Sequence, residues 1–228
     1  MAICSAKPPL TFCHLSKKLE SIVVLKSIAL CSERILRYSA DEGGSMRKVV
    51  ATELVSLDGV MESPEEWASS NSNDEMEEAN ASGMAASDAL LLGRVTYEGL
   101  AAFWPNQPAG TPMVDYINSV PKFVVSGTLE EPLGWNNSTL IKGDVAEEIT
   151  KLKQQPGKDI TILGSGALVR WLLASDLLDE LGLMVHPLVL GGGKRLFEDG
   201  GDQKPLKLVD SKSFDTGVLY VTYRPAGD

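Results

Sequence analysis

Three apolar segments that end in glycine turns constrain the fold more than any other feature of this sequence. They end at Leu92-Gly93-Arg94, at Val125-Ser126-Gly127-Thr128 and at Leu163-Gly164-Ser165-Gly166. Short apolar segments that alternate with helical patterns are typical of a mainly parallel sheet with helices on both faces. Ligands bind such sheets at the carboxyl ends of the strands, where glycine turns admit them. The sequence therefore predicts an α/β protein with a ligand site along that edge of the sheet.

The chain after residue 46 divides into alternating strands and helices. Strands are expected over residues 47–56, 122–126, 139–142 and 159–163, followed by an antiparallel hairpin of 206–213 and 217–224. Residues 85–92 and 177–186 are each expected to be the end of a helix followed by a strand. Helices are expected over 145–154, capped by Asp144 with Glu147 completing a capping box, and from the 164–166 turn to residue 174. Asp74 is a candidate helix N-cap, and residues 101–111 are expected to form a long loop. The result is a mixed, mainly parallel sheet with a C-terminal antiparallel hairpin.

Residues 1–45 differ in composition from the rest of the chain. They hold six of the 21 basic residues, four of the 31 acidic ones and all three cysteines. Interrupting lysines argue against a secretory signal, and the four acids argue against a transit peptide. The segment ends in Asp41-Glu42-Gly43-Gly44-Ser45, which is typical of a flexible linker. We expect an extension outside the fold at 1–45, one domain at 46–228 and a cytoplasmic protein, with organellar targeting by the extension left open.

The residues from Met46 onward exclude several classes of enzyme. They contain no cysteine and one histidine, His186, so thiol chemistry and a two-histidine metal site are absent. No G-x-S-x-G motif accompanies His186, which argues against a serine hydrolase. The net charge of the whole chain is −10, and this sign argues against a nucleic-acid or anionic-membrane surface. No metal site is expected.

The three strand ends carry groups that bind anions. Gly164-Ser165-Gly166 places backbone N–H groups at a helix start, where they attract phosphate. Arg94 can pair with a phosphate and Thr96 can add a hydroxyl, although Arg94 can instead pair with a glutamate one turn away. Ser126 and Thr128 add two hydroxyls, or serve to close a turn. Together they suit a multiply phosphorylated ligand such as NADPH, and the absence of a G-x-x-x-x-G-K-[ST] loop argues against ATP.

Four motifs, in this order, resemble a known family. They are Ser56-Leu57-Asp58-Gly59 and the segments 92–98, 124–129 and 163–168, with His186-Pro187 and 190–197 after them. This pattern is similar to the dihydrofolate-reductase-like superfamily, in particular to the C-terminal reductase domain of the bifunctional riboflavin-biosynthesis deaminase-reductase. The resemblance covers residues 46–225. It implies a three-layer α/β fold, NADPH as the hydride donor and a homodimer.

The resemblance also implies roles for individual residues. The residues expected to bind the cofactor are Val55, Gly93, Arg94, Thr96, Ser126, Thr128, Gly164, Ser165, Gly166, Ala167 and Leu168. Within this set, Val55 is expected beside the nicotinamide and the segment 164–168 at the pyrophosphate. Gly93, Arg94 and Thr96 are expected at the adenosine-side phosphates, and Ser126 and Thr128 near the adenosine 2′-phosphate. Asp58 and Trp67 are expected in the substrate pocket, with the loop 191–197 at another edge.

Asp58 is the candidate catalytic residue. Reduction of a C=N or C=O bond needs a proton as well as a hydride, and a short acid at the end of a central strand can reach the pocket. The dipeptide Asp58-Gly59 is also ordinary turn chemistry. Both interpretations stay open.

Two departures from the family pattern bear on function. Gly127 stands where many relatives carry an arginine that meets the adenosine 2′-phosphate, so one charge-assisted contact worth roughly 1.5–3 kcal/mol is missing. The preference between NADPH and NADH therefore stays open. No H-x-E motif with a following P-C-x-x-C of a deaminase is present.

The leading hypothesis is an NADPH-dependent reductase of a small heterocycle, of the 5-amino-6-(5-phosphoribosylamino)uracil type. Dihydrofolate or another pterin is the second substrate. A dinucleotide-binding protein without catalysis, or a dimeric scaffold, are the alternatives from other classes.

Overall fold

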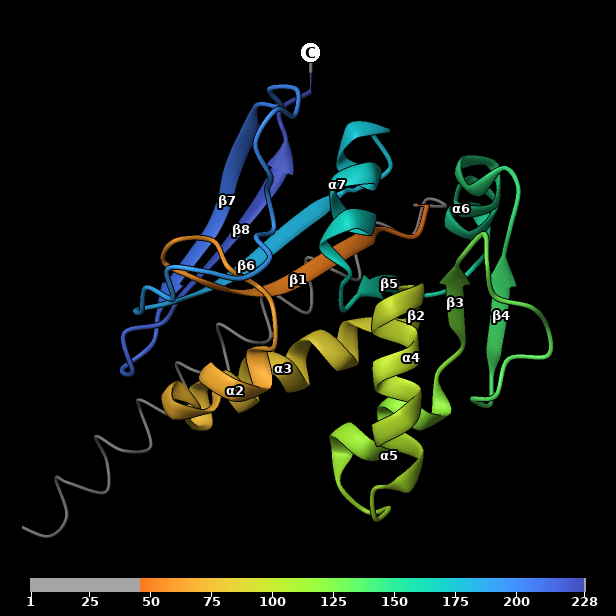
Figure 1. The fold of residues 1–228 in the computed structure, drawn as a ribbon, viewed down its shortest axis with the longest axis horizontal. Coiled ribbons are helices and arrows are strands. Elements are labelled where there is room, and N and C mark those ends of the chain that lie inside the picture. The colour runs from red at the N-terminus through yellow and green to blue at the C-terminus, as the bar shows by residue number, and fades with distance from the viewer. Residues whose placement is uncertain (1–45, 228) are drawn as a thin grey trace, which may run out of the picture. The chain divides into compact units, whose positions relative to one another are not determined.

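The computed structural model describes residues 46–227, which form one eight-stranded sheet with helices. The strands are β1 (Val49–Ser56), β2 (Ser87–Gly93), β3 (Lys122–Val125), β4 (Ser138–Ile141), β5 (Asp159–Ile162), β6 (Glu180–His186), β7 (Leu206–Ser213) and β8 (Leu219–Pro225). Their order across the sheet is β4-β3-β2-β5-β1-β6-β8-β7, and Figure 1 shows β4 and β7 at its two edges. The extension predicted at residues 1–45 lies outside the described residues.

Helices fill the connections between the strands. The α-helices are α2 (Pro64–Trp67), α3 (Asp74–Ala86), α4 (Arg94–Phe103), α5 (Pro112–Ser119), α6 (Val145–Gln154) and α7 (Gly166–Ala174). Two 3-10 turns, η1 (Ser69–Asn71) and η2 (Trp104–Asn106), follow α2 and α4. No helix among residues 46–227 is long and apolar enough to span a membrane.

The sheet is mixed and mainly parallel, as the sequence predicts. Every pair from β4 across to β6 is parallel, whereas β8 runs antiparallel to both β6 and β7. The C-terminal hairpin is therefore confirmed. Its second strand begins at Leu219 instead of residue 217, because the Gly217 N–H closes the turn by donating to Phe214 O at 2.9 Å.

Successive residues of the central strands pack on opposite faces of the sheet, which gives three layers. On β2, Leu91 joins the core beneath α6 and α7, whereas Leu90 and Leu92 join the core beneath α4 and α5. On β1, Val55 lies on the α7 side and Leu54 packs against a third cluster that includes Met76 of α3. This is the three-layer arrangement that the family resemblance implied.

The structure corrects the predicted start of one helix. The N-cap of α3 is Asn73, whose side chain accepts the Met76 N–H at 3.1 Å, and Asp74 is the first helical residue. At α6 the predicted cap is confirmed, because the Asp144 carboxylate accepts the Glu147 N–H at 3.0 Å. The Glu147 carboxylate pairs with a lysine one turn further on, Lys151, at 2.8 Å.

The long loop predicted at 101–111 is largely helical. Helix α4 continues to Phe103, and η2 follows it. Pro105 fits η2 because it lies in the first turn, where a proline is tolerated. Helix α5 was also not predicted from the sequence. That helix has Pro112 at its first position and buries Val114 and Ile117, which are three residues apart and share a face.

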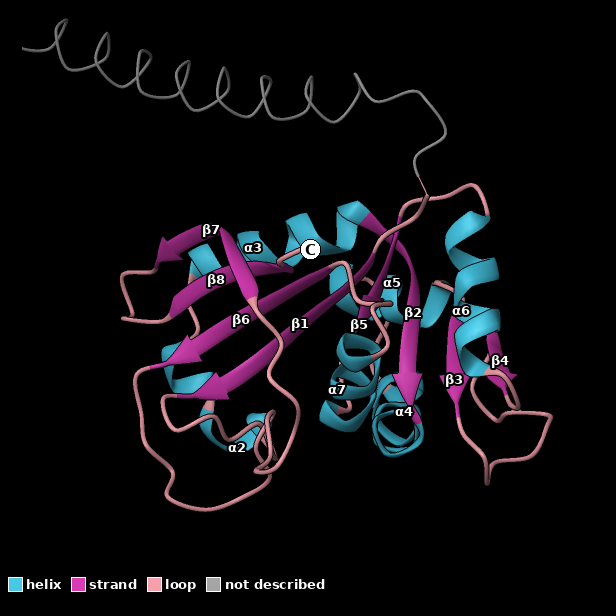
Figure 2. Cartoon of the chain, turned by 90° about the horizontal axis from the view of Figure 1, so that it is seen from above, coloured by secondary structure: helices cyan, strands magenta, loops and turns pink. Residues whose placement is uncertain are grey.

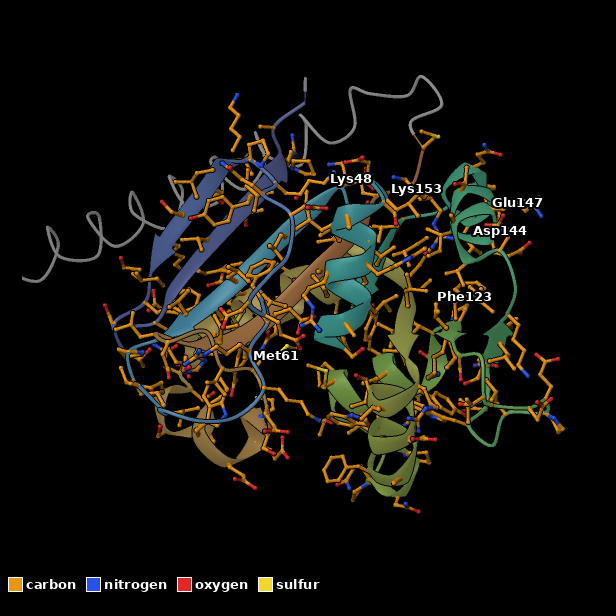
Figure 3. All side chains as sticks on the ribbon, turned by 45° about the horizontal axis from the view of Figure 1, so that its top comes forward. Lys48, Met61, Phe123, Asp144, Glu147 and Lys153 are labelled. Atoms are coloured by element: carbon orange, nitrogen blue, oxygen red, sulfur yellow. The ribbon has the colours of Figure 1, made fainter. Side chains whose placement is uncertain are left out.

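Ion pairs gather at the amino ends of the central strands. Lys48 pairs with Glu180 at 3.0 Å, and Lys153 pairs with Asp179 at 2.7 Å. Arg47 pairs with Asp88 of β2. Figure 3 labels Lys48 and Lys153 at this end, with Met61 near the far end of β1. The carboxyl ends of the strands are left for a ligand, as expected for parallel sheets.

Candidate functional site

A cavity of about 770 Å³ lies where three helices begin, beyond the carboxyl ends of the parallel strands. Its lining residues come from the starts of α4, α6 and α7 and the end of β3: Gly93, Arg94, Val95, Val125, Gly143, Asp144, Val145, Ala146, Ser165, Ala167, Leu168 and Trp171. Figure 2 shows α4 and α7 beside each other near the arrowhead of β2. The structure therefore brings two of the three predicted strand ends, and the last residue of the third strand, to one place.

The helix starts direct the positive ends of their dipoles toward this cavity. The first amides of a helix have no partner within it, and the helix dipole adds roughly half a positive charge at that end. Neither Gly93 at α4 nor Ser165 at α7 caps its helix with a side-chain hydrogen bond. The free N–H groups of both helices are therefore available to an anion, whereas the Asp144 carboxylate already caps α6.

Two of these helix starts approach each other closely at Gly93. A Cβ atom on Gly93 would lie 2.6 Å from Ser165 Oγ, so a side chain there would require the Ser165 hydroxyl to move. Gly164, which precedes Ser165, has a φ of +93°, a backbone conformation that favours glycine. The peptide bond between Gly164 and Ser165 is cis. A Cβ at Gly164 would lie 3.2 Å from the hydroxyl of Thr96 on α4.

Five of the predicted cofactor-binding residues line the cavity: Gly93, Arg94, Ser165, Ala167 and Leu168. Gly164, Gly166 and Thr96 lie directly behind that lining, and Val55 is buried in the core beneath α7. Arg94 pairs with Glu98 of its own helix at 2.9 Å. Its role toward a phosphate stays a prediction.

Ser126 and Thr128 lie next to the cavity but do not line it. The Ser126 hydroxyl accepts the N–H groups of Thr128 and Leu129 at 3.1 and 3.0 Å. It thus closes the turn after β3, where Val125 is the residue that reaches the cavity. Their expected contact with the 2′-phosphate stays a prediction.

The sequence analysis missed the third helix start and the indole beside it. Residues 143–146 and Trp171 also line the cavity. Figure 3 labels Asp144 and Glu147 at this start of α6. The signal was present, because Gly143-Asp144 follows an expected strand and opens an expected helix, and it was interpreted as capping alone.

Asp58 holds two loops together. Its carboxylate accepts hydrogen bonds from the Ser56 hydroxyl at 2.7 Å and from the N–H groups of Leu190 and Gly191 at 3.1 and 2.9 Å. These donors lower the pKa of Asp58 to about 2, so the carboxyl is ionised at neutral pH. The contacts favour the turn interpretation over the proton-donor interpretation, and they tie Leu190 and Gly191 to the turn after β1. The expected position of the 191–197 loop at an edge of the pocket stays a prediction.

Trp67 lies at the end of the sheet on the α3 side. Its ring meets the His186 imidazole edge-on, with centroids 5.3 Å apart, and its indole N–H donates to Glu62 O at 2.8 Å. His186 is completely buried, neither ring nitrogen has a hydrogen-bond partner among residues 46–227, and burial lowers its pKa. This imidazole is the last residue of β6. The placement of Trp67 in a substrate pocket stays a prediction.

One acid with unusual properties was not singled out from the sequence. Glu53 lies in the middle of β1, is 4% exposed, and receives a hydrogen bond from the Gly164 N–H. Burial raises the pKa of this carboxyl to about 8. The sequence signal that could have identified it is an acidic residue within a strand that is otherwise nearly continuously apolar. In the described part of the chain, no cluster of three or more His, Cys, Asp or Glu residues could hold a metal ion.

Comparison with known proteins places the chain in a family. It is 34% identical over 139 residues to the uncharacterized protein YyaP of Bacillus subtilis, covering 60% of this chain and 73% of that one. A putative riboflavin biosynthesis protein from Shewanella sp. PV-4 superposes with a TM-score of 0.63 at 24% identity, covering 79% of this chain and 99% of the other.

Dihydrofolate reductase from Enterococcus faecalis, solved as a complex with NADP(H), superposes with a TM-score of 0.54 at 15% identity, covering 79% and 97% of the two chains. These structures share the fold of the present one. The model of the RibD C-terminal domain matches residues 47–220, and the chain therefore belongs to the RibD C-terminal domain family.

Proposed function

We propose that this chain is an NADPH-dependent reductase of a small heterocyclic substrate, of the 5-amino-6-(5-phosphoribosylamino)uracil type. The observation that carries the proposal is the convergence of the starts of α4, α6 and α7 on one cavity of about 770 Å³. Cavities of roughly 300–1,000 Å³ are typical of small-molecule and cofactor sites. Membership of the RibD C-terminal domain family and the NADP(H) complex of a protein with the same fold support it.

The residues of the cavity fit a dinucleotide. Gly93 leaves room for backbone and ligand where a Cβ would strike Ser165, and the free amides of α4 and α7 can hold two phosphate groups. Arg94 is 45% exposed at its side chain and can turn from Glu98 to a phosphate, since an exposed ion pair is worth a few tenths of a kcal/mol. Trp171 offers an apolar wall.

The chemistry needs binding and orientation more than a protein nucleophile. NADPH, when bound, supplies a hydride. The C=N or C=O carbon of the substrate accepts that hydride, and the heteroatom accepts a proton. Because Asp58 is ionised at neutral pH, its part is to fix the loop at Leu190 and Gly191, and water is the proton source in this proposal.

The first test is a titration of NADPH and NADH against wild type, Arg94→Ala and a matched control, Arg224→Ala. Arg224 is also an exposed arginine in an ion pair, at 2.8 Å from Glu180, but it lies far along the sheet on β8. We expect NADPH to bind, to bind about ten-fold more weakly to Arg94→Ala, and to be unaffected by Arg224→Ala. Absence of NADPH and NADH binding at neutral pH would end the cofactor proposal.

The substrate is tested separately by the fall of NADPH absorbance with 5-amino-6-ribosylaminouracil phosphate, with dihydrofolate as the second substrate. Turnover of the first supports the riboflavin-type reaction, and turnover of dihydrofolate alone would replace it. One observation favours the alternative of a dinucleotide-binding protein without catalysis: the Asp58 carboxylate is ionised at neutral pH and accepts three hydrogen bonds, so it holds no proton to donate. NADPH binding with no consumption across carbonyl, imine and pterin compounds would establish that alternative.

The homodimer and the cytoplasmic location are part of the same proposal. The homodimer depends on the family resemblance, and the location depends on the argument against a secretory signal in residues 1–45. Light scattering of the purified full chain tests the dimer, for which a monomer mass at micromolar concentration is the contrary result. A fluorescent fusion with and without residues 1–45 tests the location.

A further inference from the structure

Glu53 lies beneath the turn that forms the floor of the proposed cofactor site. It points to the same face of β1 as Ala51 and Val55, which pack in the core with Leu168 and Val169 of α7. The Gly164 N–H donates a hydrogen bond to its carboxylate, and a Cβ at Gly164 would lie 3.9 Å from Glu53 Oε2. One residue of backbone therefore separates this acid from Ser165, which lines the cavity.

The second carboxyl oxygen of Glu53 has no partner. Oε1 is buried and makes no hydrogen bond within the part of the chain that the structure describes. A buried polar atom without a partner destabilises the folded state, so its presence at a ligand site calls for a functional explanation. The neighbouring glycine turn and the free amides of α7 make a bound anion the relevant ligand.

The charged groups on the surrounding helices are already paired. On α4, Arg94 and Glu98 pair with each other at 2.9 Å. On α7, Arg170 donates to Leu196 O and to the Glu198 carboxylate, both at 2.8 Å. Neither pair includes Glu53, whose titration is governed by burial and by the Gly164 N–H.

The charged groups of the neighbouring strands lie elsewhere. Lys48, which precedes β1, and Glu180, the first residue of β6, pair with each other at the amino ends of these strands, and Asp159 begins β5 at that same end. His186 of β6 shares the sheet face of Met184, on the side away from α7. The Glu53 carboxyl therefore lies among apolar groups, and an anion bound in the cavity would be the nearest charge to it.

We propose that Glu53 is a positioning residue of the dinucleotide site whose protonation is coupled to phosphate binding: the neutral carboxyl holds the Gly164–Ser165 turn from below, and its ionisation weakens the binding of the phosphates above. This inference rests on the proposed function, because it needs an anionic dinucleotide in the cavity. By linkage, phosphate binding then favours the protonated carboxyl by the same factor. Burial already raises the pKa of Glu53 to about 8, so the coupling operates in the mildly alkaline range.

Coulomb repulsion between the ionised Glu53 carboxyl and a bound phosphate sets the size of the coupling. For an assumed separation on the order of 8 Å and an effective dielectric constant of about 20, two like unit charges change a binding constant by roughly 30-fold. We therefore expect the affinity of wild type for NADPH to fall at least ~10-fold between about pH 7 and pH 9.5. We also expect roughly half a proton or more to be taken up per NADPH bound near pH 8.5.

The test is calorimetric titration of NADPH into the full chain across this pH range, in two buffers of different ionisation enthalpy, for wild type, Glu53→Gln and Glu78→Gln. Glu78 is an exposed glutamate on α3, on the other face of the sheet, and serves as the matched control. Glu53→Gln is expected to bind NADPH as tightly as wild type at pH 7, to lose the proton uptake, and to keep its affinity at pH 9.5. Glu78→Gln is expected to behave as wild type.

The outcomes separate this inference from the proposed function. NADPH binding with equal pH dependence in wild type and Glu53→Gln, or no proton uptake by wild type, would overturn the coupling and leave the cofactor site intact. No NADPH binding at pH 7 would overturn the proposed function and the coupling with it. The proton count on wild type needs no variant, so it decides the matter even if Glu53→Gln does not fold.

Discussion

Replacing Glu53 with glutamine is expected to make the protein more stable at neutral and alkaline pH. The buried carboxyl has a folded-state pKa of about 8, against an ordinary value of 4.5. Between these two values the unfolded chain releases the proton and the folded protein keeps it, so the stability of wild type falls as pH rises. Glutamine has the same shape, still accepts the Gly164 N–H with its carbonyl oxygen and does not ionise.

The magnitude follows from the difference between the two pKa values. Each unit corresponds to about 1.4 kcal/mol, so wild type loses about 3 kcal/mol by pH 7 and about 5 kcal/mol by pH 8.5, relative to strongly acidic conditions. At pH 5 the loss is below about 1 kcal/mol. Because glutamine has no such loss, the difference between the variant and wild type at pH 7 amounts to a rise in Tm of roughly 6–12 °C.

Urea denaturation at pH 5, 7 and 8.5 measures this difference directly, with Glu78→Gln as the control for loss of one exposed carboxylate. The stability of Glu53→Gln relative to wild type is expected to grow steadily over the three pH values, while that of Glu78→Gln stays constant. A Glu53→Gln difference that is the same at all three would refute the reasoning, since it would mean that the carboxyl titrates at the same pH folded and unfolded. The experiment needs no ligand, so it is independent of the proposed function.

Three further predictions concern the site and its supports. Gly93→Ala is expected to weaken NADPH binding by roughly 2- to 10-fold, because its Cβ would lie 2.6 Å from Ser165 Oγ and would displace that hydroxyl from its rotamer. Adding Ser165→Ala is expected to restore part of the affinity, and wild-type affinity in Gly93→Ala, measured by nucleotide fluorescence, would contradict the close approach. Asp58→Asn is expected to lower thermal stability and to loosen the 190–191 loop, because the Leu190 and Gly191 N–H groups donate to the Asp58 carboxylate, and to leave the pH profile of NADPH oxidation unchanged. If the variant instead loses an acidic limb from that profile, Asp58 is a titrating catalytic group. Lys122→Met is expected to lower the free energy of unfolding by about 2–4 kcal/mol, measured by urea denaturation. The reason is that the buried ammonium group donates to three backbone carbonyls, those of Asn118, Val120 and Asn136. An unchanged free energy of unfolding would mean that those carbonyls find other partners.

The sequence predicted the sheet because its strands are apolar and bounded by glycine. Buried parallel strands are apolar on both faces, so segments such as 159–163 are recognisable without knowledge of their partners. Helix α5 was missed because its short pattern, Val114 and Ile117 behind Pro112, lies in a segment rich in turn residues. The N-cap of α3 was placed one residue late, since Asn73 and Asp74 are both good caps and only the backbone at Asn73 is extended.

The candidate site, like the fold, was predicted from the sequence only in part. Local residue patterns identified the turns at Gly93 and Gly164 as candidate anion sites, because a glycine at a strand end followed by a helix start is a local feature. The sequence thus determined the fold class, the mainly parallel sheet and the edge at which a ligand is proposed to bind.

Tertiary structure alone decided which groups meet there. It set Gly93 against Ser165, joined the α6 start to the cavity, tied Asp58 to the loop at Gly191, and buried Glu53 beneath the α7 turn. The pKa values of the two acids diverge for that reason: hydrogen-bond donors from a distant loop stabilise the charge on one, and removal from water penalises the charge on the other. Both causes depend on residues far apart in sequence.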